Sequence, residues 1–370
     1  MSRVSAQAVP TPKVLIAGAG PTGLTAAVEL ARRGVPFRIV DRAEGPTPLS
    51  KAVGISPHSL DLLEPSGVTE RLLQAGVRIQ RVHVHQGDRR LATVRFAGLR
   101  HRFNFLLALP QSETEGIMAS LLAERGVGVE WRTELTGLAQ TPDMVAVTLH
   151  GPDGPEQASF EQVLGADGAR SRVREAIGVE FAGHRHERVW SIADVEMADW
   201  PYEPGSANAF FLAGGDVAFA IPIGPARFRV LSNTADALAL VPGAFRVERV
   251  LCADTFLIPV RQATSYRVGR VALAGDAGHV HSPVGGRGMN LGIEDAVCYA
   301  RRLADGSLDG YDGERRPVGH RWIAFSERAL AGAQSEGALR IAIRNTVLRL
   351  VDRFPGLQRP LLERIAGVRE

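Results

Sequence analysis

The feature that most constrains the fold of this chain is a glycine-rich turn between a short apolar run and a helical segment. Residues 14–17 (VLIA) have the composition of a buried strand, and the turn reads GAGPTG over residues 18–23. Apolar residues then recur at helical spacing over residues 24–31, and a second apolar run, 37–40, ends in Asp41. This order of strand, glycine turn, helix, strand and acid is that of the βαβ unit that binds a dinucleotide.

Each glycine of this turn has a physical task. Gly18 permits the tight turn, Gly20 lets the backbone approach a pyrophosphate, and Gly23 allows the helix to pack closely on the strand. The helix N-terminus supplies free N–H groups and positive partial charge for phosphate, and Asp41 can accept hydrogen bonds from a ribose. On these residues alone, a glycine-rich turn without a ligand is the alternative.

Two later segments repeat the combination of a strand end with glycine and aspartate. Residues 163–168 (VLGADG) predict a strand that ends in Asp-Gly, followed by a helix start near residue 171. Residues 271–274 predict another buried strand, and a glycine-rich loop and a helix from Asn290 follow it. The alternatives are helix N-caps for Asp167 and Asp276, and a surface loop for residues 285–290.

Composition and charge exclude several classes of protein. The chain has 370 residues, 45% hydrophobic and 22% charged, which is typical of a soluble globular protein with two or three subdomains. No apolar stretch reaches the roughly 20 residues of a transmembrane segment. The two cysteines can form at most one disulfide, which favours a cytoplasmic location. Because the net charge is only +3 and no basic run is interleaved with aromatic residues, we expect no nucleic-acid partner.

Histidine pairs two residues apart occur at 83/85, 184/186 and 279/281. On strands, each pair would share one face of the sheet. A metal site needs further convergent ligands at suitable spacing, and the sequence shows none, so no metal is expected. The histidines other than His279 remain candidates for a general base.

Taken together, the motifs resemble the flavoprotein aromatic hydroxylases, the family of para-hydroxybenzoate hydroxylase and the polyketide hydroxylases. The resemblance rests on GAGPTG with Asp41, on LGADGARSRVR at 164–174 and on GRVALAGDAGHVHSPVGGRGMNLGIEDA at 269–296, and it covers about residues 13–317. It implies an α/β fold with a Rossmann-like FAD-binding domain, an antiparallel β-sheet substrate domain and a C-terminal helical segment.

The resemblance also implies a chemistry. Members of the family bind FAD without a covalent link, take a hydride from NADPH or NADH, and react the reduced flavin with O2. The flavin C4a-hydroperoxide then hydroxylates an aromatic or polyketide-like small molecule, and no side chain is named as catalytic. The alternatives are a flavin-dependent halogenase or reductase on the same scaffold and a non-catalytic FAD-binding module. A W-x-W-x-I-P segment typical of the halogenases is absent from the sequence.

By the same resemblance, the glycine turn would hold the pyrophosphate and Asp41 the adenosine ribose. Lys51 and Gln111 would lie near the ribityl-phosphate side, Asp276 near the ribityl chain, and Asp167 near both flavin and nicotinamide. Residues 285–290 would surround the isoalloxazine ring. The full expected set of cofactor contacts is Gly18, Gly20, Pro21, Thr22, Gly23, Asp41, Arg42, Lys51, Gln111, Asp167, Gly275, Asp276, Pro283, Gly286, Arg287, Gly288, Met289 and Asn290.

One of these residues departs from the family pattern. Arg287 stands where the family usually has glutamine. A guanidinium fixed close to the ring would favour the anionic reduced flavin, so we hypothesise that Arg287 raises the reduction potential of the flavin.

The remaining segments predict a substrate layer and a helical tail. Short alternating runs within 181–265, joined by residues 77–103, predict an antiparallel sheet. The resemblance implies that this sheet covers the substrate pocket over the flavin. Three phenylalanines and a proline of the loop are candidates to face an aromatic substrate, with a role in the core as the alternative: Phe210, Phe211, Phe219 and Pro283. The flavin domain would comprise residues 1–76, 104–180 and 266–312.

Residues 313–370 would form the C-terminal helical segment, without room for the thioredoxin-like domain that polyketide hydroxylases often carry. An apolar stripe runs along this segment through Leu339, Ile343, Val347, Leu350 and Phe354. A helix packed on the body or in a dimer and a helix on a membrane surface are the two interpretations, and the chain is expected to be a monomer or a homodimer.

Overall fold

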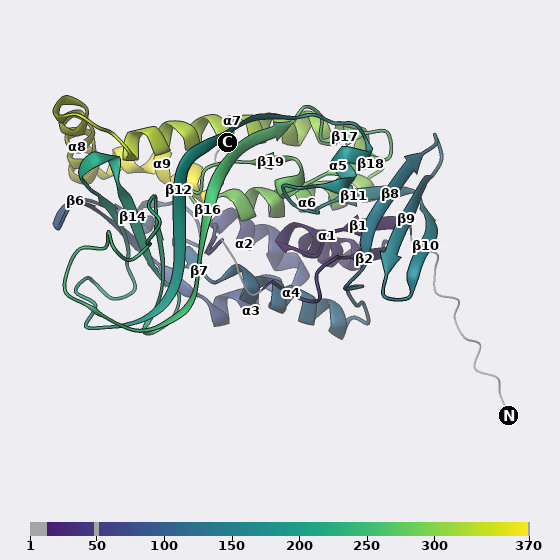
Figure 1. Ribbon diagram of the computed structural model, residues 1–370, viewed down its shortest axis with the longest axis horizontal. Coiled ribbons are helices and arrows are strands. Elements are labelled where there is room, and N and C mark those ends of the chain that lie inside the picture. Colours follow the sequence, from purple (N-terminus) through teal and green to yellow (C-terminus); the bar gives the residue numbers. More distant parts are fainter. Residues whose placement is uncertain (1–12, 48–51, 369–370) are drawn as a thin grey trace.

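The computed structural model describes residues 13–47 and 52–368. The described part of the chain forms two large sheets, two small sheets and the helices that pack around them. In Figure 1 a parallel sheet with its helices lies to the right of centre, a large antiparallel sheet lies to the left, and one long helix runs along the top of both. The expected α/β fold with an antiparallel second sheet and C-terminal helices is confirmed.

The parallel sheet has the strand order β17-β18-β11-β1-β2. Its strands are β1 (Val14–Ala17), β2 (Phe37–Val40), β11 (Gln162–Gly165) and β18 (Val271–Leu273), with β17 (Arg267–Val268) antiparallel at one edge. Because the central strands are parallel, their carboxyl ends meet at one edge of the sheet. The glycine turn, Asp41 and the Asp-Gly turn therefore lie together there.

Three helices stabilise this sheet. Helix α1 (Pro21–Arg32) follows the glycine turn and packs on α6 (Gly288–Ala304) and on α4 (Gln111–Glu124). The apolar residues of β1 are at most 3% exposed, and those of α1 and α6 join the same core cluster. This core fixes the carboxyl edge of the sheet, where the site lies.

The large sheet has eight strands in the order β19-β16-β12-β15-β14-β13-β5-β6, and all neighbours are antiparallel except β13 and β5, which are parallel. Two long strands, β12 (Phe181–Ala198) and β16 (Arg246–Ala263), run side by side near one edge of the sheet and are prominent in Figure 1. The others are β5 (Arg81–Gln86), β6 (Arg89–Arg95), β13 (Ala207–Phe211), β14 (Val217–Pro222), β15 (Arg227–Ser232) and β19 (His279–Val280). Since β19 directly precedes the glycine-rich loop, the loop is joined to this sheet.

The two faces of the large sheet pack against different clusters. Successive side chains of a strand point to opposite faces. Phe210 belongs to one buried cluster, whereas Phe211 and Phe219 pack with Val284 of the glycine-rich loop in another. The second face is therefore the one that looks toward the loop.

Two small sheets complete the fold. One contains β3 (Gly54–Ile55), β7 (Leu106–Ala108) and β4 (Val77–Ile79), and the other contains β8 (Glu134–Gln140), β9 (Val145–Gly151) and β10 (Gly154–Phe160). Within the segment 77–103, β4 thus pairs outside the large sheet, while β5 and β6 join it. The short helices are α2 (Pro57–Leu63), α3 (Val68–Ala75), α5 (Arg172–Ala176), η1 (Glu64–Ser66), η2 (Phe96–Gly98), η3 (Ala213–Gly215), η4 (Gly275–Ala277) and η5 (Leu308–Gly310).

Three helices end the chain: α7 (Tyr311–Ala333), α8 (Ala338–Arg353) and α9 (Pro355–Ala366). Helix α8 lies against β6, but none of its residues, all of which are described, is buried. The apolar stripe of α8 faces outward, with Leu339 74% exposed. Across residues 13–47 and 52–368, every helix is too short or too polar to cross a bilayer.

Candidate functional site

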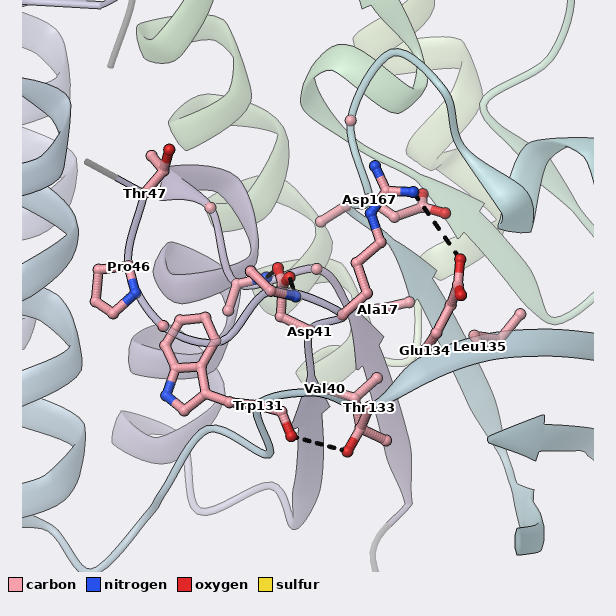
Figure 2. A pocket seen from close by; sticks show the side chains of 18 of the residues that line it. Ala17, Val40, Asp41, Pro46, Thr47, Trp131, Thr133, Glu134, Leu135 and Asp167 are labelled. Carbon is pink, nitrogen blue, oxygen red and sulfur yellow. Dashed lines mark hydrogen bonds and ion pairs between the residues drawn. The ribbon is translucent and has the colours of Figure 1, made fainter. Parts of the chain in front are cut away.

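A cavity of about 570 Å³ opens at the carboxyl edge of the parallel sheet. Figure 2 shows side chains from several segments around it, among them Asp41, Trp131 and Asp167. The lining residues are Ala17, Gly18, Ala19, Gly20, Val40, Asp41, Arg42, Ala43, Gly45, Pro46, Thr47, Gln111, Glu115, Trp131, Thr133, Glu134, Leu135, Ala166, Asp167, Gly168, Arg170 and Arg172.

The glycine turn forms one wall of this cavity with the geometry that a phosphate needs. Gly18 has φ +106°, and a Cβ there would overlap the carbonyl of Ala166. A Cβ at Gly20, by contrast, would meet no other atom of the described residues within 4 Å, so this side of the turn is open. Gly20 is also the N-cap of α1 and has no side chain to cap the helix. The first-turn N–H groups therefore remain available to an anion.

Asp41 is held in place at the next wall of the cavity. Its Oδ2 accepts a hydrogen bond from the N–H of Ala19 at 2.6 Å, and its Oδ1 accepts one from the N–H of Ala43 at 2.8 Å. The carboxylate thus links the end of β2 to the glycine turn. Arg42 lies at the rim, where its side chain is 61% exposed and pairs with Glu134 at 3.9 Å.

The contacts of Asp167 are compatible with both interpretations of the sequence, a helix N-cap and a cofactor contact. Its Oδ2 accepts a hydrogen bond from the N–H of Val173 at 3.1 Å, in the first turn of α5, beside the N-cap Ser171. Its Oδ1 is buried and has no hydrogen-bond partner among the described residues. Burial raises the pKa of Asp167. An orphaned carboxyl oxygen beside a polar cavity fits a hydroxyl group of a ligand.

Gln111 closes the far end of the cavity. Its backbone N–H donates to Ala52 O at 3.1 Å, and its Nε2 donates to Glu115 Oε1 at 2.8 Å. Burial raises the pKa of Glu115, which also lines the cavity. Lys51, expected near Gln111, lies outside the described residues.

The glycine-rich loop before α6 forms a second region. Gly285 and Gly286 have φ of +97° and +63°. Asn290 fastens the loop to β3: its Oδ1 accepts from Ser56 N at 2.7 Å, and its Nδ2 donates to the carbonyls of Gly54 and Gly286. This leaves the N-terminus of α6 beside backbone that a flat ring could approach.

Arg287 is buried and paired with an acid. Its guanidinium donates to Ser56 Oγ at 3.0 Å, forms an ion pair with Glu294, and lies 4.9 Å from the centre of the Trp322 ring. Arg315 binds the other oxygen of Glu294 at 3.0 Å and Asp295 at 2.7 Å. The Glu294 carboxylate offsets the charge that the hypothesis about the flavin potential relied on.

Several expected cofactor residues also have a structural role or a defined exposure. Thr22 is wedged between Gly275 and Gly292, where any Cβ would overlap its Oγ1. Pro21 occupies the first position of α1, and Met289 is 8% exposed within the core. Asp276 is exposed on η4, and Pro283 is half-buried. His279 donates or accepts locally, with its Nε2 2.7 Å from Asp295 Oδ2.

The structure separates the three phenylalanines. Phe211 and Phe219 lie on the face of the large sheet that packs against Val284 of the loop. Phe210 is fully buried on the opposite face, where its ring lies 4.9 Å from that of His85. The structure thus brings two of the three phenylalanines to the loop.

Sequence reasoning missed two parts of the site. Trp131 and Thr133 line the cavity because a bridge between Val40 and Glu130 brings their segment beside β2. Arg229 of β15 is buried, pairs with Asp194 at 2.7 Å and donates to Ala52 O at 2.6 Å. Neither segment carries a motif. For Arg229, the only signal in the sequence was the opposite charge of Asp194 on a neighbouring strand.

Comparison with known proteins identifies the family. A model of the FAD binding domain matches residues 11–228 and 237–326. The chain belongs to the family of FAD-dependent aromatic monooxygenases. It is 34% identical to 6-methylpretetramide 4-monooxygenase of Streptomyces rimosus, over 96% of this chain and 67% of that protein.

Solved structures agree with the fold. The p-nitrophenol 4-monooxygenase of Pseudomonas putida superposes with a TM-score of 0.86 over 97% of this chain and 99% of that one, at 24% identity, which shows the fold alone. An anhydrotetracycline hydroxylase from Streptomyces rimosus gives a TM-score of 0.80 at 28% identity, over 97% of this chain and 76% of that one.

Proposed function

We propose that this protein is a monooxygenase that uses FAD, NADPH or NADH, and O2 to hydroxylate an aromatic or polyketide-like small molecule. The observation that carries the proposal is a cavity in which an open glycine turn, a fixed carboxylate and an orphaned carboxyl oxygen converge. The names of two relatives support the substrate class, because one is a monooxygenase of 6-methylpretetramide and the other a hydroxylase of anhydrotetracycline.

The residues of the cavity fit the adenosine and pyrophosphate half of FAD. The turn at Gly18 and Gly20, with the N-terminus of α1, would hold the pyrophosphate. Asp41 would accept the ribose hydroxyls, and Asp167 would accept a hydroxyl at its orphaned oxygen. Gln111 would meet the ribityl-phosphate side. When bound, the flavin supplies the hydride acceptance and the activation of oxygen.

The protein's own task at the ring is to place charge and to exclude water. The N-terminus of α6 at Gly288 would stabilise negative charge on the reduced ring with backbone N–H groups. Phe211, Phe219 and Val284 are partly buried and pack against one shared apolar cluster between the large sheet and α7. We infer that they shield the reacting centre from water and orient a flat substrate.

The test is a screen of phenols and polycyclic aromatic compounds with the FAD-loaded protein. We expect at least one compound to accelerate the oxidation of NADPH or NADH and to gain one oxygen atom, as mass spectrometry of the product would show. Product that carries halogen when halide is present would favour the halogenase. NAD(P)H oxidation without an oxygenated product would favour a reductase. A protein that holds FAD but oxidises nothing with any compound would favour the binding module.

A further inference from the structure

Two histidines and a glutamate converge on one point away from the FAD cavity. His184 and His186 lie two residues apart on β12, and Glu327 lies on α7. The Nε2 of His184 is 3.2 Å from Glu327 Oε2, and the Nε2 of His186 is 3.0 Å from Glu327 Oε1. All three ligand atoms lie within 4.8 Å of one another. We propose that these residues form a binding site for a divalent transition-metal ion of the zinc type.

The spacing of the three groups matches a tetrahedral site. With metal–ligand bonds of about 2.0–2.1 Å, two ligands of a tetrahedral zinc ion lie roughly 3.3 Å apart. The two Nε2 atoms lie 3.2 and 3.0 Å from different oxygens of Glu327, which is close to that value, and every pair of the three ligand atoms lies within 4.8 Å. A metal ion would bind both Nε2 atoms, each neutral imidazole would carry its proton on Nδ1, and any further proton would pass to solvent, so the side chains would need to move little.

The backbone fixes the two imidazoles in this arrangement. A bulge interrupts the pairing of β12 with β16, which runs from Arg185 opposite Pro259 to Val189 opposite Leu257. Proline cannot donate to the ladder, and such bulges redirect side chains. At Gly183, with φ +141°, a Cβ would overlap the carbonyl of Val260, so the strands approach closely just before the pair. The rings lie 5.2 Å apart at 75°.

Exposure leaves room for solvent ligands. The side chain of His184 is 58% exposed, that of His186 30% and that of Glu327 26%. Two imidazoles and one carboxylate with an open fourth position suit Zn2+, Co2+, Ni2+ and Cu2+, whereas Mg2+ and Ca2+ prefer oxygen ligands alone. Sequence spacing predicted no metal because the third ligand lies 141 residues beyond His186.

The site would join two elements of the fold. Helix α7 also carries Trp322, which packs over Arg287 and lies 3.8 Å from a Cβ position at Gly285 of the glycine-rich loop. A metal ion that bridges β12 and α7 would therefore hold the helix that supports this loop. We expect binding to raise the unfolding temperature, since a ligand of the native state stabilises it by mass action.

The experiment uses the FAD-loaded chain with any affinity tag removed, after treatment with a chelator. Titration with ZnCl2 in a calorimeter should show one Zn2+ bound per chain in the micromolar range or tighter. His184→Ala, His186→Ala and Glu327→Gln should each weaken binding at least tenfold and abolish the rise in unfolding temperature. His320→Ala, an exposed histidine on α7, is the matched control and should bind as the unaltered chain does.

Because the side chain of His184 is mostly exposed, His184→Ala should fold even if Glu327→Gln does not. The proposal is overturned if Zn2+ shows no saturable binding, or if it binds His184→Ala as tightly as the unaltered chain, which would reveal weak binding at other surface histidines. The measurement contains no aromatic substrate, so its outcome is independent of the proposed oxygenation.

Discussion

Gly18 and Gly20 belong to one turn but meet different surroundings. A Cβ at Gly18 would overlap backbone, whereas one at Gly20 would enter the open side of the turn at φ −72°, which any residue adopts. Gly20→Ala should therefore leave the unfolding free energy of the apoprotein unchanged but weaken FAD binding about tenfold or more, because the methyl group occupies space that the pyrophosphate needs.

Fluorescence titration with FAD and chemical denaturation would measure the two effects. Gly313→Ala in α7, where a methyl group likewise meets open space, is the control and should bind FAD normally. Equal FAD affinity in Gly20→Ala would place the pyrophosphate elsewhere.

His281 predicts a dependence of stability on pH. Burial lowers the pKa of His281 from 6.5 to about 4, and its Nδ1–H donates to Ser282 O at 2.8 Å. Below pH 6.5, His281 is therefore protonated in the unfolded chain but stays neutral in the folded chain. This contribution to stability is complete above about pH 6.5 and is lost as pH falls toward 4, by at most about 1.4 kcal/mol per pH unit.

His281→Gln should flatten this slope in urea unfolding measured between pH 4 and 7. His150→Gln, an exposed histidine on β9, should keep the slope of the unaltered chain. If His281→Gln unfolds with the same pH dependence as the unaltered chain, the imidazole is accessible to protons in the folded state.

At the scale of elements, Asn290 of α6 makes three hydrogen bonds, with Gly54 of β3, with Ser56 directly after that strand and with Gly286 of the glycine-rich loop. Asn290→Ala leaves buried backbone groups of Ser56 and Gly54 without partners, so the unfolding free energy should fall by about 2–3 kcal/mol. FAD affinity should fall too, since the loop loses its anchor. Asn104→Ala, at an exposed residue, should change neither quantity in denaturation and titration. Unchanged FAD affinity in a folded Asn290→Ala variant would separate the loop from the flavin.

Arg287 links the start of α6 to another part of the fold through its contact with Ser56, and it pairs with Glu294 of the same helix. Arg287→Gln removes one of two guanidinium partners of buried Glu294 and should lower the unfolding free energy by about 3 kcal/mol. Because Glu294 already offsets the charge, the flavin reduction potential should stay unchanged, as spectroelectrochemical titration would show. Arg349→Gln on exposed α8 serves as the stability control. A marked fall in potential would instead support the hypothesis drawn from the sequence.

At the scale of the whole molecule, the sequence predicted what depends on local pattern. The strand before the glycine turn, the turn itself and Asp41 follow from periodicity and from the conformational freedom of glycine. The sequence could not predict which face of the sheet Phe210 and Phe211 each occupy. Adjacent phenylalanines on a strand fit either register, and a shift of one residue exchanges the faces. Trp131 and Glu327 reach their sites through pairing between distant segments, which no local pattern encodes.

The central claim is that the cavity at the edge of the parallel sheet holds the adenosine half of FAD. Equilibrium binding to the chain stripped of flavin tests it most directly. We expect one FAD per chain, with the visible spectrum of a bound flavin, and we expect ADP to compete for the cavity while FMN does not. A chain that takes up no FAD, or that binds FAD equally well in saturating ADP, would contradict the claim.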